Sequence, residues 1–270
     1  ATVYGSPASL PVSEDALLKA YNPYGQTKLM IEKFLSDLYK ADNAWKIIIL
    51  RYFNPIGAHS SGLIGENPIG TPNNLLPYIS QVAIGGRKIL SIYGNDYPTT
   101  DGTCIRDYIH VVDLVKGHTK ALDYLLNETD MKDFKNTAIN LGIGRGYSVL
   151  EILKAFEKAC DFSIKYQYVE RRQGDVSEIY SNPALAQKLL GWKAQFGIQE
   201  MCSDAWNWQM KNPNGFERGP FFCGVSMVLA VPQFTIGFNA PTSTSKQKSI
   251  AWRFADENGM VIQMDNSSGS

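Results

Sequence analysis

The chain has 270 residues, and its 26 lysines and arginines balance its 26 aspartates and glutamates, so the formal net charge is zero. A neutral chain has no overall attraction for nucleic acid or for an anionic membrane, and any polyanion that it binds must meet cations placed locally. Hydrophobic residues make up 44% of the sequence and charged residues 19%, which excludes a disordered or fibrous protein and indicates an ordinary globular one.

The first predicted helix begins at Asn22-Pro23, because asparagine caps helices and proline suits their first turn. We expect it to end near residue 41 or 42. Residues 46–52, Lys-Ile-Ile-Ile-Leu-Arg-Tyr, follow as an apolar run typical of a strand covered on both faces inside a parallel sheet. A helix followed by a buried strand indicates an α/β fold. The expected buried stripe of the helix, with helical spacing, is Ile31, Phe34, Leu35 and Leu38.

The same alternation continues, less strictly, to residue 211. We expect strands at 89–93, 137–141 and 164–168, and helices at 75–84, 111–126, 149–159, 183–190 and 199–211. Alternation this sustained favours a twisted, partly parallel sheet with helical cover. His118 lies on the apolar stripe of the helix at 111–126, and we interpret it as a packed side chain. The other members of that stripe are Val111, Leu114, Val115, Leu122 and Leu125.

Residues 217–270 differ in character from residues 1–216, and we treat them as a separate appendage. Residues 239–246, Asn-Ala-Pro-Thr-Ser-Thr-Ser-Lys, have the composition of a linker. Residues 250–254 and 260–263 flank Asn258-Gly259, a pair that predicts a hairpin turn. The last residues, 266–270, are expected to be disordered.

The cysteines and the apolar segments predict the compartment. Cys104, Cys160, Cys202 and Cys223 form no Cys-x-x-Cys pair, which favours buried thiols over disulfides or a zinc site. The longest nearly apolar stretch, 221–231, is well short of the ~20 residues that span a bilayer, and no signal peptide is apparent. We therefore expect a soluble, cytoplasmic protein without a metal.

Tyr24 and Lys28 are candidates for acid-base chemistry. They stand four residues apart on the first predicted helix, which places both side chains on one face. A phenol is a poor base at neutral pH, but a neighbouring ammonium group favours its ionised form. The pair could therefore transfer a proton, although the same spacing also fits a surface lysine beside a packed tyrosine.

Asn54 is a candidate ligand for a hydroxylated molecule. It lies in Phe53-Asn54-Pro55-Ile56-Gly57, directly after the predicted strand, and ligands of open α/β sheets bind at the carboxyl ends of strands. Its amide offers both a donor and an acceptor. By contrast, Gly142-Ile-Gly144-Arg-Gly146 lacks the Gly-x-Gly-x-x-Gly spacing of a pyrophosphate-binding turn, and we interpret it as a tight connection followed by a capping Ser148.

Several segments together resemble the UDP-glucose 4-epimerases, which are extended short-chain dehydrogenases/reductases. They occur in that family's order between residue 1 and about residue 216, whereas the segment after 216 shows no such resemblance. The segments are Ala1-Thr-Val-Tyr-Gly5, Pro23-Tyr-Gly-Gln-Thr-Lys28, Leu50-Arg-Tyr-Phe-Asn-Pro55, Thr71-Pro-Asn-Asn-Leu75, Tyr93-Gly-Asn-Asp-Tyr97, Asp101-Gly-Thr103 with Arg106-Asp-Tyr-Ile-His110, and Arg171-Arg-Gln-Gly-Asp175.

The resemblance implies that a tightly held NAD and a UDP-sugar share one cleft. Tyr24 would take the proton from the sugar 4-hydroxyl while hydride leaves C4, and the 4-keto sugar would then turn over and be reduced on its other face. This implies reversible interconversion of UDP-glucose and UDP-galactose, as in galactose metabolism. Lys28 would favour the ionised tyrosine and, with Tyr24, hold the nicotinamide ribose, and Phe53 would contact the cofactor.

The resemblance also implies a set of residues for the UDP-sugar. Arg106 and Arg172 can each fork onto a diphosphate, and Asp175 can accept hydrogen bonds from ribose hydroxyls. Ile179 corresponds to a position where side-chain bulk decides whether an N-acetyl group fits, so UDP-N-acetylglucosamine is a further candidate substrate. The complete set is Thr2, Tyr52, Phe53, Asn54, Asn73, Asn74, Leu75, Ser91, Ile92, Tyr93, Arg106, Arg172 and Asp175.

One element of a dinucleotide-binding fold is missing from the sequence. No Gly-x-Gly-x-x-Gly turn followed by an acidic residue ~20 positions later occurs in it. The resemblance puts that turn, and a catalytic serine, before Ala1. We therefore expect an N-terminally truncated chain: an incomplete Rossmann-type doubly wound sheet plus a smaller α/β substrate domain. In such a chain the strand at 46–52 loses sheet neighbours and exposes apolar surface. By itself this chain is expected to bind NAD poorly and to have negligible epimerase activity.

Two other functions remain open. The chain could be a catalytically inactive fragment that binds a nucleotide sugar or a partner, with residues 217–270 as its interaction element. It could also be another extended reductase acting on nucleotide sugars, such as a dehydratase or a decarboxylase, although Ala1-Thr-Val-Tyr-Gly5 lacks the acidic pair of the dehydratases. The resemblance further implies a homodimer, and nothing indicates nucleic acid or membrane as a partner.

Overall fold

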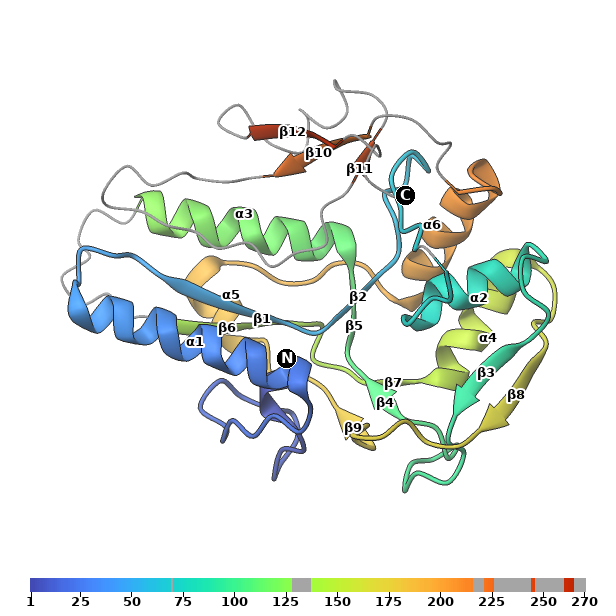
Figure 1. Ribbon diagram of the computed structural model, residues 1–270, viewed down its shortest axis with the longest axis horizontal. Coiled ribbons are helices and arrows are strands. Elements are labelled where there is room, and N and C mark those ends of the chain that lie inside the picture. The colour runs from blue at the N-terminus through green and yellow to red at the C-terminus, as the bar shows by residue number, and fades with distance from the viewer. Residues whose placement is uncertain (69, 128–136, 216–220, 226–243, 246–259, 265–270) are drawn as a thin grey trace, which may run out of the picture.

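The computed structural model describes the chain except at residues 69, 128–136, 216–220, 226–243, 246–259 and 265–270 (Figure 1). Its helices are η1 (Thr2–Tyr4), α1 (Pro23–Ala41), α2 (Leu75–Ala83), α3 (Val111–Asn127), α4 (Val149–Cys160), α5 (Ala184–Leu190) and α6 (Ile198–Lys211). Its strands are β1 (Ile48–Tyr52), β2 (Asn54–Ile56), β3 (Leu90–Tyr93), β4 (Ile105–Arg106), β5 (Tyr108–His110), β6 (Thr137–Leu141), β7 (Tyr147–Ser148), β8 (Tyr166–Val169), β9 (Glu178–Ile179), β10 (Phe221–Val225), β11 (Thr244–Ser245) and β12 (Met260–Met264).

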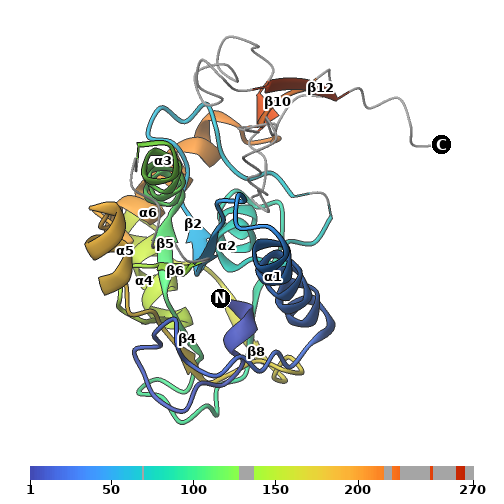
Figure 2. The same cartoon turned by 90° about the vertical axis from the view of Figure 1, so that its left-hand side faces the viewer.

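Parallel pairing dominates the first part of the chain and confirms the α/β prediction. β1 pairs with β6, β2 with β5 and β3 with β8, each in parallel, and β4 lies between parallel β9 and antiparallel β7. Each predicted helix and strand up to residue 211 is present within a few residues of its expected bounds. Figure 2 shows α1 and α5 on opposite sides of the strands.

Two groups of helices enclose separate apolar cores. Helices α3 and α5 pack on β5 and β6, whereas α2, α4 and α6 pack around β3 at the other end of the molecule (Figure 1). The first core is centred on Ile109, Leu114, Ile139, Leu141, Ala186 and Leu190. The second is centred on Ile79, Leu90, Ile92, Ile152, Phe156 and Met201.

The expected burial of α1 is wrong. Ile31 is 43% exposed and Phe34 is 66% exposed, and Gly25 is the one buried residue of this helix. Ile31, Phe34 and Leu35 border an open cavity, and Leu35 and Leu38 are only half-buried. The local helical pattern is therefore present, but its apolar stripe is not fully covered.

β1 is not covered on both faces as its apolar pattern indicates, but it exposes apolar surface as expected for a truncated sheet. Its residues Ile48, Ile49 and Leu50 are only half-buried, because β6 is the one strand that pairs with it in the described structure. A smaller misprediction concerns α3. Its Leu114 and Leu125 are buried as expected, but Val115 is 47% exposed.

A buried carboxylate holds together the segments around β4 and β5. Asp107 accepts hydrogen bonds from the backbone N–H groups of Ile143, Gly144 and Ser181 and from the Ser181 hydroxyl, at 2.6–3.2 Å. Burial raises the pKa of the Asp107 carboxyl, and these four donors oppose that effect. The connection at 142–146 is a tight turn ending in Ser148, which caps α4 in a capping box with Glu151, as predicted.

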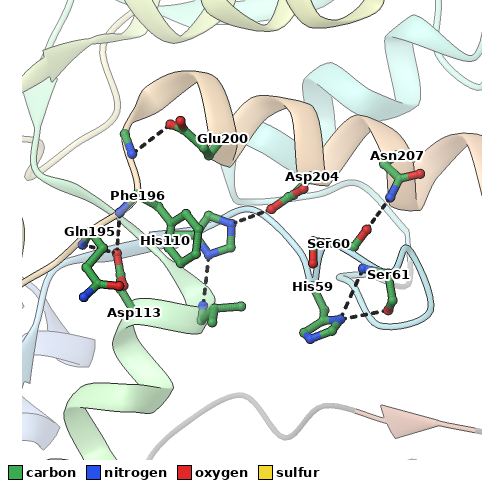
Figure 3. Close-up of polar contacts among 12 residues, drawn as sticks. His59, Ser60, Ser61, His110, Asp113, Gln195, Phe196, Glu200, Asp204 and Asn207 are labelled. Atoms are coloured by element: carbon green, nitrogen blue, oxygen red, sulfur yellow. Dashed lines mark hydrogen bonds and ion pairs between the residues drawn. The ribbon is translucent and has the colours of Figure 1, made fainter.

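A buried histidine joins the end of β5 to α6 (Figure 3). The Val112 N–H donates to His110 Nδ1 at 3.0 Å, so the ring proton lies on Nε2, which donates to Asp204 at 3.1 Å. Beside it, the Asp113 carboxylate accepts from the backbone N–H groups of Gln195 and Phe196 at 2.8 Å each. These contacts fix the approach to α6.

The predictions about the cysteines, membrane spans, metal sites and the segment after residue 216 are tested in part. Cys160 and Cys202 are buried as expected, whereas Cys104 is half-buried. Within the described residues no helix is long and apolar enough to cross a membrane, and no cluster of side chains suits a metal. β12 pairs antiparallel with β10. The predicted turn at Asn258-Gly259, the strand at 250–254 and the end at 266–270 lie outside the described residues.

Candidate active site

One cavity of about 960 Å³ brings together most of the residues that the sequence singled out. It runs between α1, β1 and α3 toward the loop that precedes β9, so residues distant in sequence share its walls. The predicted site residues that line it are Thr2, Tyr24, Lys28, Tyr52, Phe53, Asn54, Asn74, Arg106, Asp175 and Ile179.

Tyr24 and Lys28 lie on one side of this cavity, at the start of α1. The Asn22 side chain caps the helix by accepting the Gly25 N–H at 2.7 Å, and this sets the first turn. The Lys28 ammonium lies 5.2 Å from the centre of the Tyr24 ring, so the two side chains are neighbours as the spacing predicts. A Cβ atom at Gly25 would lie 3.0 Å from the Thr2 hydroxyl oxygen, so glycine lets the helix approach η1 closely.

A buried ion pair attaches α1 to β1. Arg51 forks onto the Glu32 carboxylate with distances of 2.7 and 3.0 Å, and both side chains are nearly buried. Arg51 also donates to the Tyr4 hydroxyl at 3.0 Å, and Tyr4 in turn donates to the Asn140 side chain at 2.6 Å. This network attaches the helix that carries Tyr24 and Lys28 to β1 and η1, and Leu29 of the same helix packs on the core around Tyr4 and Phe53.

The end of β1 forms the floor of the site. The Phe53 ring is buried against Tyr4, with ring centres 6.5 Å apart, and Asn54 leaves its side chain exposed at the cavity. Tyr52 lies near His118, with 6.0 Å between ring centres, and burial raises the pKa of the Tyr52 hydroxyl. His118 is half-buried at the edge of the cavity, and its Nδ1 lies 2.9 Å from the Leu114 carbonyl oxygen.

The opposite wall carries the charged groups. Arg106 in β4 lies 3.7 Å from the Asp175 carboxylate, and both border the cavity. Asn74, on the way into α2, donates its side-chain N–H to Glu66 at 2.9 Å. Burial raises the pKa of the Glu66 carboxyl. A cation here can meet a dianionic ligand whose other end reaches Tyr24.

Some predicted residues do not border the cavity. Ile92 is 1% exposed because β3 alternates buried and half-buried positions, so Ser91 and Tyr93 face the other way. Arg172 stacks over Tyr93 at 4.0 Å and donates to the Asn73 carbonyl oxygen at 3.2 Å. The predicted residues outside the lining are Asn73, Leu75, Ser91, Ile92, Tyr93 and Arg172.

The sequence reasoning missed Glu32 and Arg51, which border the same cavity. Two signals could have found them. Glu32 follows Lys28 by four residues, on the face that carries Tyr24, and Arg51 interrupts an otherwise apolar strand. A charge in a buried strand calls for a partner.

Comparisons with known proteins agree with this geometry. The model of the family described as GDP-mannose 4,6 dehydratase matches residues 1–205. The chain belongs to that family. Among curated proteins it is 56% identical to the UDP-glucose 4-epimerase of Bacillus subtilis over 217 residues, which are 80% of this chain and 62% of that protein. It is likewise 56% identical to the Drosophila melanogaster UDP-glucose 4-epimerase over 217 residues, covering 80% and 61% of the two chains.

Solved structures show the same likeness. The UDP-glucose 4-epimerase of Bifidobacterium longum, in complex with NAD⁺ and UDP, has a TM-score of 0.75 and 50% identity, over 80% of this chain and 63% of that one. The Stenotrophomonas maltophila enzyme, with NAD and formylated UDP-arabinopyranose, has a TM-score of 0.74 and 46% identity, over 78% and 61%. The resemblance inferred from sequence motifs is thereby confirmed. The chain spans about three fifths of the length of these relatives.

Proposed function

We propose that this protein interconverts UDP-glucose and UDP-galactose by oxidation and re-reduction at C4, as in galactose metabolism. The observation that carries the proposal is that Tyr24 and Lys28 border the same cavity as Arg106 and Asp175. A proton-transferring pair thus faces a cation that can hold a diphosphate. The identity of 56% to two UDP-glucose 4-epimerases supports this choice of reaction.

Tyr24 is the proposed acid and base. Its hydroxyl removes the proton of the sugar 4-hydroxyl and later returns a proton to the same oxygen. The Lys28 ammonium lies beside this tyrosine, 5.2 Å from the centre of the Tyr24 ring. The Arg51–Glu32 pair holds this helix in place and touches no reacting atom.

The residues at the Tyr24 end of the cavity fit the nicotinamide part of NAD. Tyr24 and Lys28 offer polar groups to a ribose, and the Phe53 ring offers an apolar surface beside them. NAD, when bound, supplies the acceptor and donor of hydride at C4. The chain contains no Gly-x-Gly-x-x-Gly turn, so we propose that the pyrophosphate is held by polypeptide beyond these residues.

The proposed UDP-sugar site extends from Asn54 to the charged wall. Arg106 and Arg172 hold the diphosphate, and Asp175 accepts from the ribose of the nucleotide. Ile179 lies beside Asp175 on the cavity wall and is the proposed limit on the size of the sugar substituent. Backbone groups of β3 complete the site for the base, because the Ile92 side chain is buried. The further proposed contacts are Thr2, Tyr52, Phe53, Asn73, Asn74, Leu75, Ser91 and Tyr93.

A second proposal concerns these residues taken by themselves. Half-covered β1 and the missing glycine-rich turn favour binding of a nucleotide sugar without turnover.

We also propose a homodimer, for which the exposed Met30 and Phe34 of α1 offer apolar surface.

The test compares two preparations. One is the chain as printed, and the other is the same chain joined to the part of the Bacillus subtilis relative that it does not match. The joined protein, given NAD, should convert UDP-galactose to UDP-glucose, whereas the chain alone should bind UDP without turnover. An inactive but folded joined protein, or a chain that does not bind UDP, would refute the proposal.

A further inference from the structure

Two adjacent arginines in the segment after β8 contact different tyrosines. Arg172 stacks over Tyr93 at 4.0 Å, whereas Arg171 stacks over Tyr97 at 4.1 Å. Only Arg172 belongs to the proposed UDP-sugar site. Binding of the UDP-sugar therefore does not explain the contacts of Arg171.

Arg171 is fully engaged by the segment that follows β3. Its Nε donates to the Asp96 carboxylate at 2.7 Å, and its Nη2 donates to the Asp96 carbonyl oxygen at 2.6 Å. Arg171 holds the pKa of the Asp96 carboxyl below its usual range. The Tyr97 ring below the guanidinium is 5% exposed. The two hydrogen bonds to Asp96 and the stacking on Tyr97 together orient the Arg171 guanidinium.

Gly94 lies where the segments after β3 and β8 pack closely against each other. Its φ of +81° suits glycine, and a Cβ atom there would lie 2.6 Å from the Tyr97 ring and 2.8 Å from Arg171 Cγ. The Gly94 N–H also donates to the Val169 carbonyl oxygen at 2.8 Å, which extends the pairing of β3 with β8. The two segments thus leave the paired strands side by side.

Each of these segments leads to a residue of the proposed site. The segment after β8 continues directly from Arg171 to Arg172 and Asp175. The segment after β3 continues through 94–104 to Arg106, which meets Asp175 at 3.7 Å. The contacts between the segments after β3 and β8 therefore fix the positions of Arg106, Arg172 and Asp175.

We propose that Asp96, Tyr97 and Arg171 form a latch that positions Arg172 for the diphosphate and Asp175 for the ribose of the nucleotide. The inference rests on the proposed function, because it assumes that UDP binds between Arg106 and Arg172. The latch residues do not border the cavity, and the charge of Arg171 is balanced by Asp96. They are positioning residues and contact no substrate.

Titration of the chain as printed with UDP, followed calorimetrically, tests the latch. Arg171→Ala and Asp96→Asn should each raise the Kd for UDP by about three- to tenfold, since the pair is exposed but forked and stacked. Arg172→Ala should raise it further and marks the site itself. Lys116→Ala is the control, because Lys116 is an exposed cation that stacks over Phe196 at 5.2 Å and neither residue borders the cavity or belongs to the proposed site. It should leave the Kd unchanged.

The Asp96→Asn variant separates positioning from plain electrostatic attraction. Removing a negative charge would tighten UDP binding if Arg171 acted through its charge, whereas loss of the latch weakens it. Hydrogen exchange in the absence of ligand gives an independent readout, because backbone amides of 170–177 should exchange faster in Arg171→Ala than in the unchanged chain.

The outcomes are distinct. If UDP binds and Arg172→Ala weakens it, but Arg171→Ala and Asp96→Asn do not, the latch is wrong and the proposed function stands. If Asp96→Asn tightens binding, or if exchange at 170–177 is unchanged, the latch is likewise wrong. If the folded chain does not bind UDP, the proposed function is wrong and the latch with it.

Discussion

Tyr24 and Lys28 meet at the cavity because local signals place them there. Asn22 and Pro23 start α1, and a spacing of four residues turns both side chains to one face. This part of the site could be predicted from the sequence alone. Sequence signals mark Glu32 and Arg51 individually, but the pairings Arg51–Glu32 and Arg171–Asp96 could not be predicted, because the partners are 19 and 75 residues apart and only the folded chain brings them together.

Ile179 makes a residue-scale prediction about substrate size. It is 8% exposed, pairs with Arg106 in the β4·β9 register and lies on the cavity wall. Ile179→Tyr would fill space beside the sugar. In the joined protein it should reduce turnover of UDP-N-acetylglucosamine relative to UDP-glucose by at least about tenfold. Equal discrimination by both forms would rule out a gate at this position.

His110 makes a prediction about pH. Burial lowers the pKa of the His110 ring, and the Asp204 carboxylate opposes this effect only in part. The unfolded chain therefore binds a proton near the ordinary value of about 6.5, whereas the folded chain binds it only at lower pH. Unfolding becomes more favourable as pH falls through this window, and stability is lost on acidification. Burial lowers the pKa of His118 as well, with the same sign.

Urea unfolding at about pH 7.5 and about pH 5.5 measures this loss. The unchanged chain should be less stable at the lower pH, and His110→Gln should lose less on acidification. Gln keeps an N–H that can donate to Asp204 and cannot take up the proton. The same pH-dependent loss in both proteins would show that His110 does not contribute.

At the scale of elements, the bounds of helices were predicted well and their burial was not. Caps and apolar spacing are local, so α1 and α4 begin where Asn22 and Ser148 predict. The burial of a helix depends on which other elements pack against it, and the apolar spacing within the helix does not identify those elements. The stripe of α1 is not fully covered in the described structure, and Phe34 is 66% exposed.

The attachment of α1 can be tested by a double-mutant cycle. Arg51→Met leaves the Glu32 carboxylate unpaired in a nearly buried position, which should cost about 3 kcal/mol of unfolding free energy. The double variant Arg51→Met, Glu32→Leu should cost less than the sum of the single changes. Lys33→Met is a control on the same helix, because its pair with Asp37 is exposed, and it should cause no measurable loss. Additive effects at Arg51 and Glu32 would contradict a direct pairing.

At the scale of the whole molecule, the cavity has a wall that carries Arg106 and Asp175 and an open side lined by apolar residues. The apolar residues of α1, β1 and α3 border the cavity together. The α/β class and the parallel pairing could be predicted, because alternation of helices and strands requires crossovers. The apolar pattern alone does not predict the open side. The missing glycine-rich turn does, because it implies that the strand at 46–52 loses sheet neighbours.

This organisation predicts that binding of the two ligands can be separated. The chain as printed should bind UDP through Arg106 and Arg172, because Arg106 is held beside Asp175 and Arg172 is held against Asn73 and Tyr93. It should show no comparable binding of NAD, because it contains no glycine-rich turn for the pyrophosphate. Calorimetric titration with each ligand measures both. Tight binding of NAD to the chain alone would contradict this separation of UDP binding from NAD binding.

The most direct test of the account is the rate of UDP-galactose conversion by Tyr24→Phe in the joined protein with NAD. Removing the hydroxyl deletes the proposed acid and base and leaves the cavity walls intact. We expect the rate to fall by about 10²- to 10⁴-fold while the Kd for UDP stays unchanged. Conversion at the undiminished rate would contradict the assignment of Tyr24 and with it the proposed mechanism.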